Sequence, residues 1–295
     1  ARGRRSNPVE WNSSDDPPTE RPLSAPIRPR LVNDAPPLET ELERARDLSV
    51  SELADAIESI GFECTRCGAC CKGHERADGA GTEPHTATVF PDEVRRLQSV
   101  AADADGRGRE SEPADSDVDD SHRDDEGETR ESYDWRDVAR PMPYGIVDGE
   151  DGPEGETFEW ALQTDACGDC IFYEEVGERA DGTAKGACQV HEDRPLICET
   201  YPFSVALGGT SQPMGEAVDE AGMVRAHECE GLGRDIDRAD AEALAAALKE
   251  RAVRELREAI DVRDNYDPVD SAESDVVVHD SEGPKHVDGT PVDDT

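Results

Sequence analysis

Four cysteines within eight residues constrain this chain more than any other feature of its sequence. Cys64, Cys67, Cys70 and Cys71 follow the spacing C-x-x-C-x-x-C-C. Thiolates this close in sequence lose little further chain entropy when they gather around one soft or borderline cation. The stretch therefore predicts a metal site. Helical spacing could bring all four sulfurs to one side, and Gly68 would permit a tight knuckle instead.

The adjacency of Cys70 and Cys71 bears on the number of metal atoms. Two neighbouring residues can both ligate one tetrahedral ion only with local strain. We therefore expect that one of the pair serves a second metal or that the site is polynuclear. The first three cysteines match the start of a bacterial ferredoxin run, but the fourth follows immediately and no proline comes after it. A ferredoxin-type iron–sulfur cluster is compatible with this pattern without being indicated by it.

Composition limits the partners that this chain can have. Acidic residues number 71 and basic residues 31, of which 27 are arginine and 4 lysine, giving a formal net charge of −40. This pattern is typical of a protein from a halophilic archaeon, whose acidic surface stays hydrated in concentrated salt. The negative electrostatic field of this surface disfavours direct binding to a nucleic-acid backbone.

The sequence also indicates a cellular location. No apolar run approaches the roughly 20 residues that span a bilayer, and polar residues and prolines follow Arg2, Arg4 and Arg5, where an export signal would be apolar. Four of the nine cysteines lie within eight residues, an arrangement that disulfides satisfy poorly. We expect a protein of the reducing cytoplasm with no membrane partner.

Apolar periodicity and proline content divide the chain into three parts. Residues 1–36 are predicted to be a disordered proline-rich arm, and residues 261–295 a disordered acidic tail. Residues 37–260 would form a cysteine-cluster metal-binding domain, interrupted by a disordered acidic insertion at 101–132. Short helices are expected at 38–60, with Ser49 or Ser51 as a cap, and a long helix at 239–260. The predicted fold class is α+β: a small, irregular, metal-stabilised domain with several helices and few short strands.

The remaining cysteines follow the insertion and occur in distinctive surroundings. A second knuckle, Cys-Gly-Asp-Cys, occupies residues 167–170. Further on, the chain reads Cys188-Gln-Val-His191, then Arg-Pro-x-x-Cys-x-x-Tyr-Pro-Phe over residues 194–203. The last cysteine is Cys229.

This arrangement resembles the YkgJ-type CxxCxxCC cysteine-cluster family, described as a zinc- or iron-chelating domain. The positions that match the family's motifs are Cys64, Cys67, Cys70, Cys71, Cys170, Phe172, Cys188, Arg194, Pro195, Cys198, Tyr201, Pro202, Phe203, Cys229 and Gly231. Three positions depart from them. His191 lies where tyrosine is frequent, Glu199 replaces a usual arginine, and Cys167 is additional.

The resemblance implies metal chelation by the cysteines. The candidate ligands are Cys64, Cys67, Cys70, Cys71, Cys167, Cys170, Cys188, Cys198 and Cys229. Eight matching thiols suit two four-thiolate sites or one larger assembly, and Cys167 could replace Cys170 in either. Arg194 could donate hydrogen bonds to the thiolates, Tyr201 could shield them from water, and His191 is a candidate neighbour or substitute ligand.

The predicted function is therefore that of a metal-binding protein that holds zinc or iron, with an iron–sulfur cluster left open. The alternatives are an iron–sulfur-dependent oxidoreductase, or a protein-modifying enzyme related to flagellin lysine methylase. Ligation by thiolates alone leaves no open position for a hydrolytic water, and no glycine-rich cofactor loop follows a predicted strand. The pattern assigns no catalytic residue and no protein partner.

Overall fold

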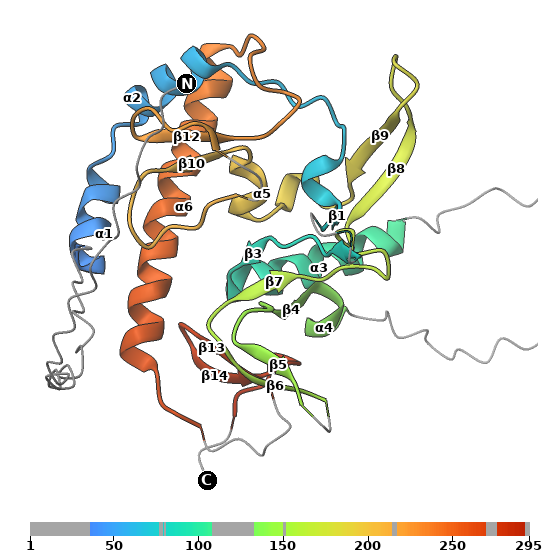
Figure 1. Cartoon of the computed structure of the whole chain (residues 1–295), viewed down its shortest axis with the longest axis vertical. Helices are drawn as coiled ribbons and strands as arrows, with labels where there is room; N and C mark the ends of the chain where they lie inside the picture. The colour runs from blue at the N-terminus through green and yellow to red at the C-terminus, as the bar shows by residue number, and fades with distance from the viewer. Residues whose placement is uncertain are drawn as a thin grey trace, which may run out of the picture. The chain divides into compact units, whose positions relative to one another are not determined.

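The computed structural model describes residues 36–76, 79, 81–107, 133–149, 152–213, 217–269 and 276–292. The predicted arm at 1–36, apart from Pro36, lies outside the described residues, as does most of the predicted insertion, from residue 108 to 132. The rest contains helices and runs of consecutive short strands, which confirms the α+β class (Figure 1). The strands are short, as expected, and more numerous than the sequence indicated.

A first apolar core is built mainly from helices. It contains α1 (Leu38–Asp47), α2 (Val50–Ile60) and the long α6 (Arg238–Asn265), together with a sheet of order β10 (Phe203–Val205), β12 (Val224–His227) and β11 (Ala217–Asp219). Figure 1 shows α6 running beside α1 and α2. The hydroxyl of Ser49 accepts a hydrogen bond from the Glu52 amide and caps α2, as the sequence predicted.

A second apolar core surrounds a sheet of order β3 (Thr88–Val89), β7 (Trp160–Leu162) and β4 (Ala139–Pro141). Helix α3 (Pro91–Arg107) contributes Val94 and Leu97, and α4 (Trp135–Val138) follows the undescribed segment. The rings of Trp135 and Trp160 meet edge to face, with centroids 5.1 Å apart. This core therefore joins residues from both sides of the predicted insertion.

Part of the predicted disordered tail is ordered. Helix α6 continues to Asn265, and β13 (Val276–Asp280) and β14 (Gly283–His286) form a hairpin in a sheet of order β14-β13-β6-β5, with β6 at Pro153–Thr157 and β5 at Ile146–Asp148. All five residues of β13 are buried. The sequence did not indicate this because β13 pairs in parallel with β6, whose register places Val277 opposite Glu156.

Truncating a valine of this strand is expected to destabilise the fold. Val278 is 0% exposed, so Val278→Ala should lower the free energy of unfolding by about 1–3 kcal/mol through lost burial and a residual cavity. Val147→Ala in the same sheet is the matched control because Val147 is 61% exposed. Chemical denaturation of both variants measures the difference. Equal midpoints would mean that the hairpin does not belong to the folded unit.

The remaining strands form two hairpins: β1 (His74–Glu75) with β2 (Thr82–Glu83), and β8 (Tyr173–Glu178) with β9 (Ala184–Cys188). The second of these carries Cys188 at its end. Of the helices in the described part of the chain, none has the length and apolar character needed to cross a membrane.

Candidate metal centre

The first four cysteines lie on a tight knuckle rather than on an α-helix. Gly68 adopts a left-handed conformation, with φ of 77°, immediately before the 3-10 turn Ala69–Cys71. The Cys71 amide closes the turn by donating to the Gly68 carbonyl at 2.9 Å. A Cβ at Gly68 would lie 2.6 Å from the side chain of Tyr173, so both the conformation and the space require glycine.

Backbone hydrogen bonds join this knuckle to segments that follow the predicted insertion. The Cys170 amide donates to the Cys71 carbonyl at 2.8 Å, and the Gly186 amide donates to the Arg66 carbonyl at 2.8 Å. Directly before the knuckle in the sequence, the Glu63 amide donates to the carbonyl of Gly231, two residues after Cys229. Three distant parts of the sequence are thus fixed against one knuckle by the backbone alone.

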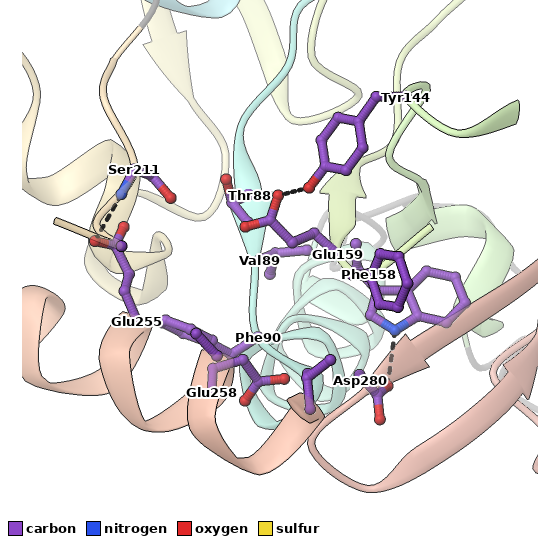
Figure 2. A pocket seen from close by; sticks show the side chains of 14 residues that line it. Thr88, Val89, Phe90, Tyr144, Phe158, Glu159, Ser211, Glu255, Glu258 and Asp280 are labelled. Carbon is purple, nitrogen blue, oxygen red and sulfur yellow. Dashed lines mark hydrogen bonds between the residues drawn. The ribbon is translucent and has the colours of Figure 1, made fainter. Parts of the chain in front are cut away.

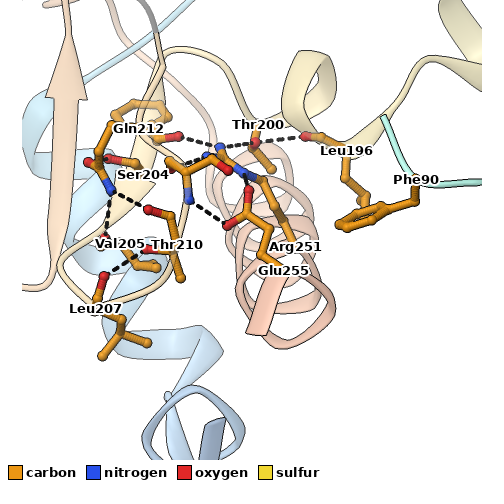
Figure 3. Close-up of polar contacts among 12 residues, drawn as sticks. Phe90, Leu196, Thr200, Ser204, Val205, Leu207, Thr210, Gln212, Arg251 and Glu255 are labelled. Carbon is orange, nitrogen blue, oxygen red and sulfur yellow. Dashed lines mark hydrogen bonds and ion pairs between the residues drawn. The ribbon is translucent and has the colours of Figure 1, made fainter. Parts of the chain in front are cut away.

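Cys198 lies on the short helix α5 (Leu196–Thr200), which is held at both ends by buried side chains. The Glu93 carboxylate accepts a hydrogen bond from the Leu196 amide at 3.0 Å. At the other end, the Arg251 guanidinium donates to the Thr200 hydroxyl at 2.8 Å and to the Phe203 carbonyl at 3.0 Å (Figure 3). These two contacts set the position of α5, and therefore of Cys198, relative to α3 and α6.

Cys71 and three thiols from the later segments pack at the edge of the second core. We call Cys71, Cys170, Cys188 and Cys198 the inner thiol group. Burial, together with the neighbouring thiols of Cys188 and Cys70, raises the pKa of Cys170 to about 12. Burial also raises the pKa of Cys198 well above its ordinary value, with additional contributions from Cys170, Cys70 and Cys188. Cys170, Cys188 and Cys198 are therefore close enough to influence one another's pKa values, and Cys70 acts on all three. Cys71 joins the group through its packing against the same core.

A second set of thiols lies on the other side of Cys70. We call Cys64, Cys67 and Cys229 the outer thiol group. Burial, together with the charges of Cys67, Cys70 and Cys64, raises the pKa of Cys229 to about 11. Cys70 raises the pKa of Cys229 and also the pKa values of Cys198 and Cys188 in the inner thiol group. It therefore lies close to both groups.

Cys167 is separate from both groups. It is exposed, and its amide donates to the Asp165 side chain at 2.8 Å in the turn before Cys170. Cys170, by contrast, is 7% exposed and belongs to the second core. Of the two cysteines that the sequence left as alternatives, Cys170 is the one placed among other thiols.

The three predicted neighbours of the metal centre are differently placed. Arg194 lies near enough to Cys70 and Cys188 for its charge to act towards lower thiol pKa values. Larger effects raise both pKa values: the hydrogen bond with Cys71 and then burial for Cys70, and burial for Cys188. The same guanidinium contacts the exposed ring of His191, with Nη1 2.7 Å from Nε2. The Tyr201 hydroxyl donates to the Glu228 carbonyl at 2.5 Å, and burial followed by the charges of Cys229, Cys70 and Cys67 raises its pKa.

The donor chemistry suits zinc or iron. The gathered donors are thiols, the ligands that zinc and iron accept, and the Sγ atoms of Cys70 and Cys71 are 3.8 Å apart. Within the described ranges, no three Cys, His, Asp or Glu side chains are arranged closely enough to enclose an ion. The thiols are therefore gathered without forming a complete coordination shell. A bound cation would deprotonate its ligands and replace their mutual repulsion with attraction to one centre.

Two side chains that position the site were missed by sequence reasoning. Glu93 and Arg251 are each 2% exposed, although a charged residue of an amphipathic helix is ordinarily expected on its solvent side. Periodicity cannot distinguish a solvated charge from one that is buried against a distant segment. The available signal was the place of Arg251 shortly after an alanine-rich stretch of the helix.

The comparisons with known proteins agree with this chemistry. The family model CxxCxxCC, described as a "putative zinc- or iron-chelating domain", matches residues 63–230. This range includes all nine cysteines and ends directly after Cys229. No curated protein and no solved structure matches the chain.

Proposed function

This chain belongs to the CxxCxxCC family of zinc- or iron-chelating domains, and from that premise we propose that it binds two metal ions through two adjacent four-thiolate sites. The observation that supports the proposal most strongly is the convergence of thiols from four separate segments on the knuckle that contains Cys70. Thiolate ligands select zinc, iron or an iron–sulfur cluster over oxygen-preferring ions such as magnesium and calcium.

The proposed ligand sets follow from the two thiol groups. The inner thiol group supplies four ligands to one site. The outer thiol group supplies three ligands to the other site, and Cys70, which acts together with Cys67 and Cys64 on the pKa of Cys229, supplies the fourth. Cys70 and Cys71 thus serve different ions, which removes the strain expected if neighbouring residues shared one. Arg194, near Cys70 and Cys188, would offset part of the negative charge of the thiolates.

The identity of the metal is tested by anaerobic purification of the full chain in high salt, followed by elemental analysis and an absorption spectrum. Two zinc ions per chain with no visible absorption would support structural four-thiolate sites. Visible absorption with acid-labile sulfide would identify an iron–sulfur centre and favour the oxidoreductase alternative. Protein that purifies folded without either metal would contradict the proposal.

The two cysteines of the second knuckle provide a matched pair of variants. Cys170→Ser should release one of the two metal ions, because it removes a buried member of the inner thiol group. Cys167→Ser should retain both ions, since Cys167 is not among the thiols that pack against the second core or that act on the pKa of Cys229. Elemental analysis of each purified variant measures the difference. Loss of metal from Cys167→Ser with retention in Cys170→Ser would reverse the assignment.

A further inference from the structure

A cavity of about 290 Å³ lies between α6 on one side and strands β3 and β7 on the other. Its lining draws on residues that adjoin both cores, a common location for ligand sites (Figure 2). The walls are largely apolar and aromatic, formed by Val89, Phe90, Phe158, Trp160, Ala259 and Val262. No cysteine lines this cavity, so it is distinct from the candidate metal centre.

Carboxylates from two sides face this apolar space. Glu159 extends from the start of β7, and Glu255 and Glu258 extend from α6 (Figure 2). Glu255 is neutralised by Arg251 at 2.9 Å. Glu159 accepts a hydrogen bond from the Tyr144 hydroxyl, and Glu258 accepts one from the Ser281 amide at 2.9 Å. Neither of these last two carboxylates forms an ion pair with any residue that the structure describes.

This lack of a counter-ion sets the cavity apart from the surrounding structure. Buried Asp280 pairs with Lys285 at 2.8 Å, and buried Glu93 has Arg254 at 3.9 Å. The lining of the cavity contains no lysine, arginine or histidine. Burial first, and then the charges of Glu255 and Glu258, raise the pKa of Glu159 to about 7. The lining of the cavity thus combines carboxylates with apolar walls and contains no cationic side chain.

We propose that this cavity binds a small alkylammonium ion, whose charged group donates hydrogen bonds to Glu159 and Glu258 while its hydrocarbon chain contacts the aromatic wall. Arg254 already lies over the ring of Phe90 and His279 stacks on Phe158, so these rings offer the ligand apolar surface. The apolar walls exclude a hard divalent ion, which requires six or more oxygen ligands. Within the described residues, moreover, no three acidic side chains have the geometry of a metal site. The proposal does not depend on the metal centre.

The test is a calorimetric titration of the full chain with n-butylammonium chloride in high salt at about pH 8, where Glu159 is mostly ionised. We expect saturable binding of one ligand per chain. Glu159→Gln and Glu258→Gln should each weaken it at least about tenfold, because each removes a charge-assisted hydrogen bond. Glu250→Gln is the matched control, since Glu250 is an exposed residue of α6 outside the cavity.

Binding should also weaken on lowering the pH below about 7, as Glu159 becomes protonated. The other titratable groups facing this carboxylate are Glu255 and Glu258 of α6, the Tyr144 hydroxyl, and Asp280 of β13. The uncharged analogue 1-butanol separates attraction to the charge from simple filling of an apolar space, and should show no saturable binding.

Both glutamine variants replace a partly buried acid by a neutral side chain of similar shape, and circular dichroism would verify that they fold. Several results would overturn the proposal: no saturable binding to the wild-type chain, equal affinity for 1-butanol, or equal weakening by Glu250→Gln. Complete competition by potassium ions at matched ionic strength would also overturn it, because it would identify an inorganic cation as the occupant.

Discussion

Removing the bound metal is expected to unfold the second core while the first core keeps much of its helical structure. Three members of the inner thiol group, Cys71, Cys188 and Cys198, pack directly against buried residues of the second core, and Cys170 is one of those residues. Structural metal contributes on the order of 10 kcal/mol in small metal-dependent folds, more than the whole stability of many domains. The first core contains no cysteine.

The two cores can be followed separately by spectroscopy. The tryptophans Trp135 and Trp160 belong to the second core, so their fluorescence should shift towards that of exposed indole after chelation. Ellipticity from α1, α2 and α6 should fall much less, and added zinc or iron should restore both signals. The measurement is made under reducing conditions at constant salt, so that disulfide formation and screening do not contribute. An unchanged fluorescence spectrum in fully demetallated protein would contradict this prediction.

Replacing Arg251 by methionine is expected to produce the largest loss of stability from a single side chain remote from the thiols. Its guanidinium pairs with Glu255 at 2.9 Å and donates to the Thr200 hydroxyl and to the carbonyls of Phe203 and Ser211 (Figure 3). The side chain of Glu255 is only 9% exposed and would be left as an uncompensated charge. Removing one partner of a buried pair costs about 3–5 kcal/mol.

Arg257→Met is the matched control for this variant because Arg257 is an exposed residue of the same helix. The double change Arg251→Met with Glu255→Gln should recover part of the loss, since it also removes the unpaired charge. Thr200 lies two residues after Cys198, so Arg251→Met should also accelerate metal release to a chelator, whereas Arg257→Met should not. If both single variants had the same denaturation midpoint, Arg251 would not be anchoring α5.

Local patterns predicted the helices and the gathering of the cysteines. The apolar spacing at 38–60 and 239–260 located α1, α2 and α6, because one face of each helix packs in the first core. The cysteine spacing predicted thiols from both sides of the insertion in one region, and the structure brings them there. Such features are encoded within a few residues, so sequence reasoning can detect them.

The features that the sequence did not reveal depend on distant partners. Strand β13 is buried because it pairs with β6, more than one hundred residues earlier in the chain, and three consecutive valines alone gave no reason to expect that pairing. Nothing local in the sequence marks Arg251 and Glu93 as buried, because each donates to or accepts from a backbone group of a distant segment. The cavity likewise exists only where α6 meets β3 and β7. The halophilic source and the cytoplasmic location stay predictions.

The central claim is that eight of the nine thiols bind metal in two adjacent sites and that Cys167 does not. The most direct measurement is alkylation of the native, reduced, metal-loaded chain, followed by mass spectrometry of each cysteine-containing peptide. The account predicts rapid labelling of Cys167 alone, with the other eight thiols labelled only after chelation. Rapid labelling of all nine thiols in folded protein would contradict it.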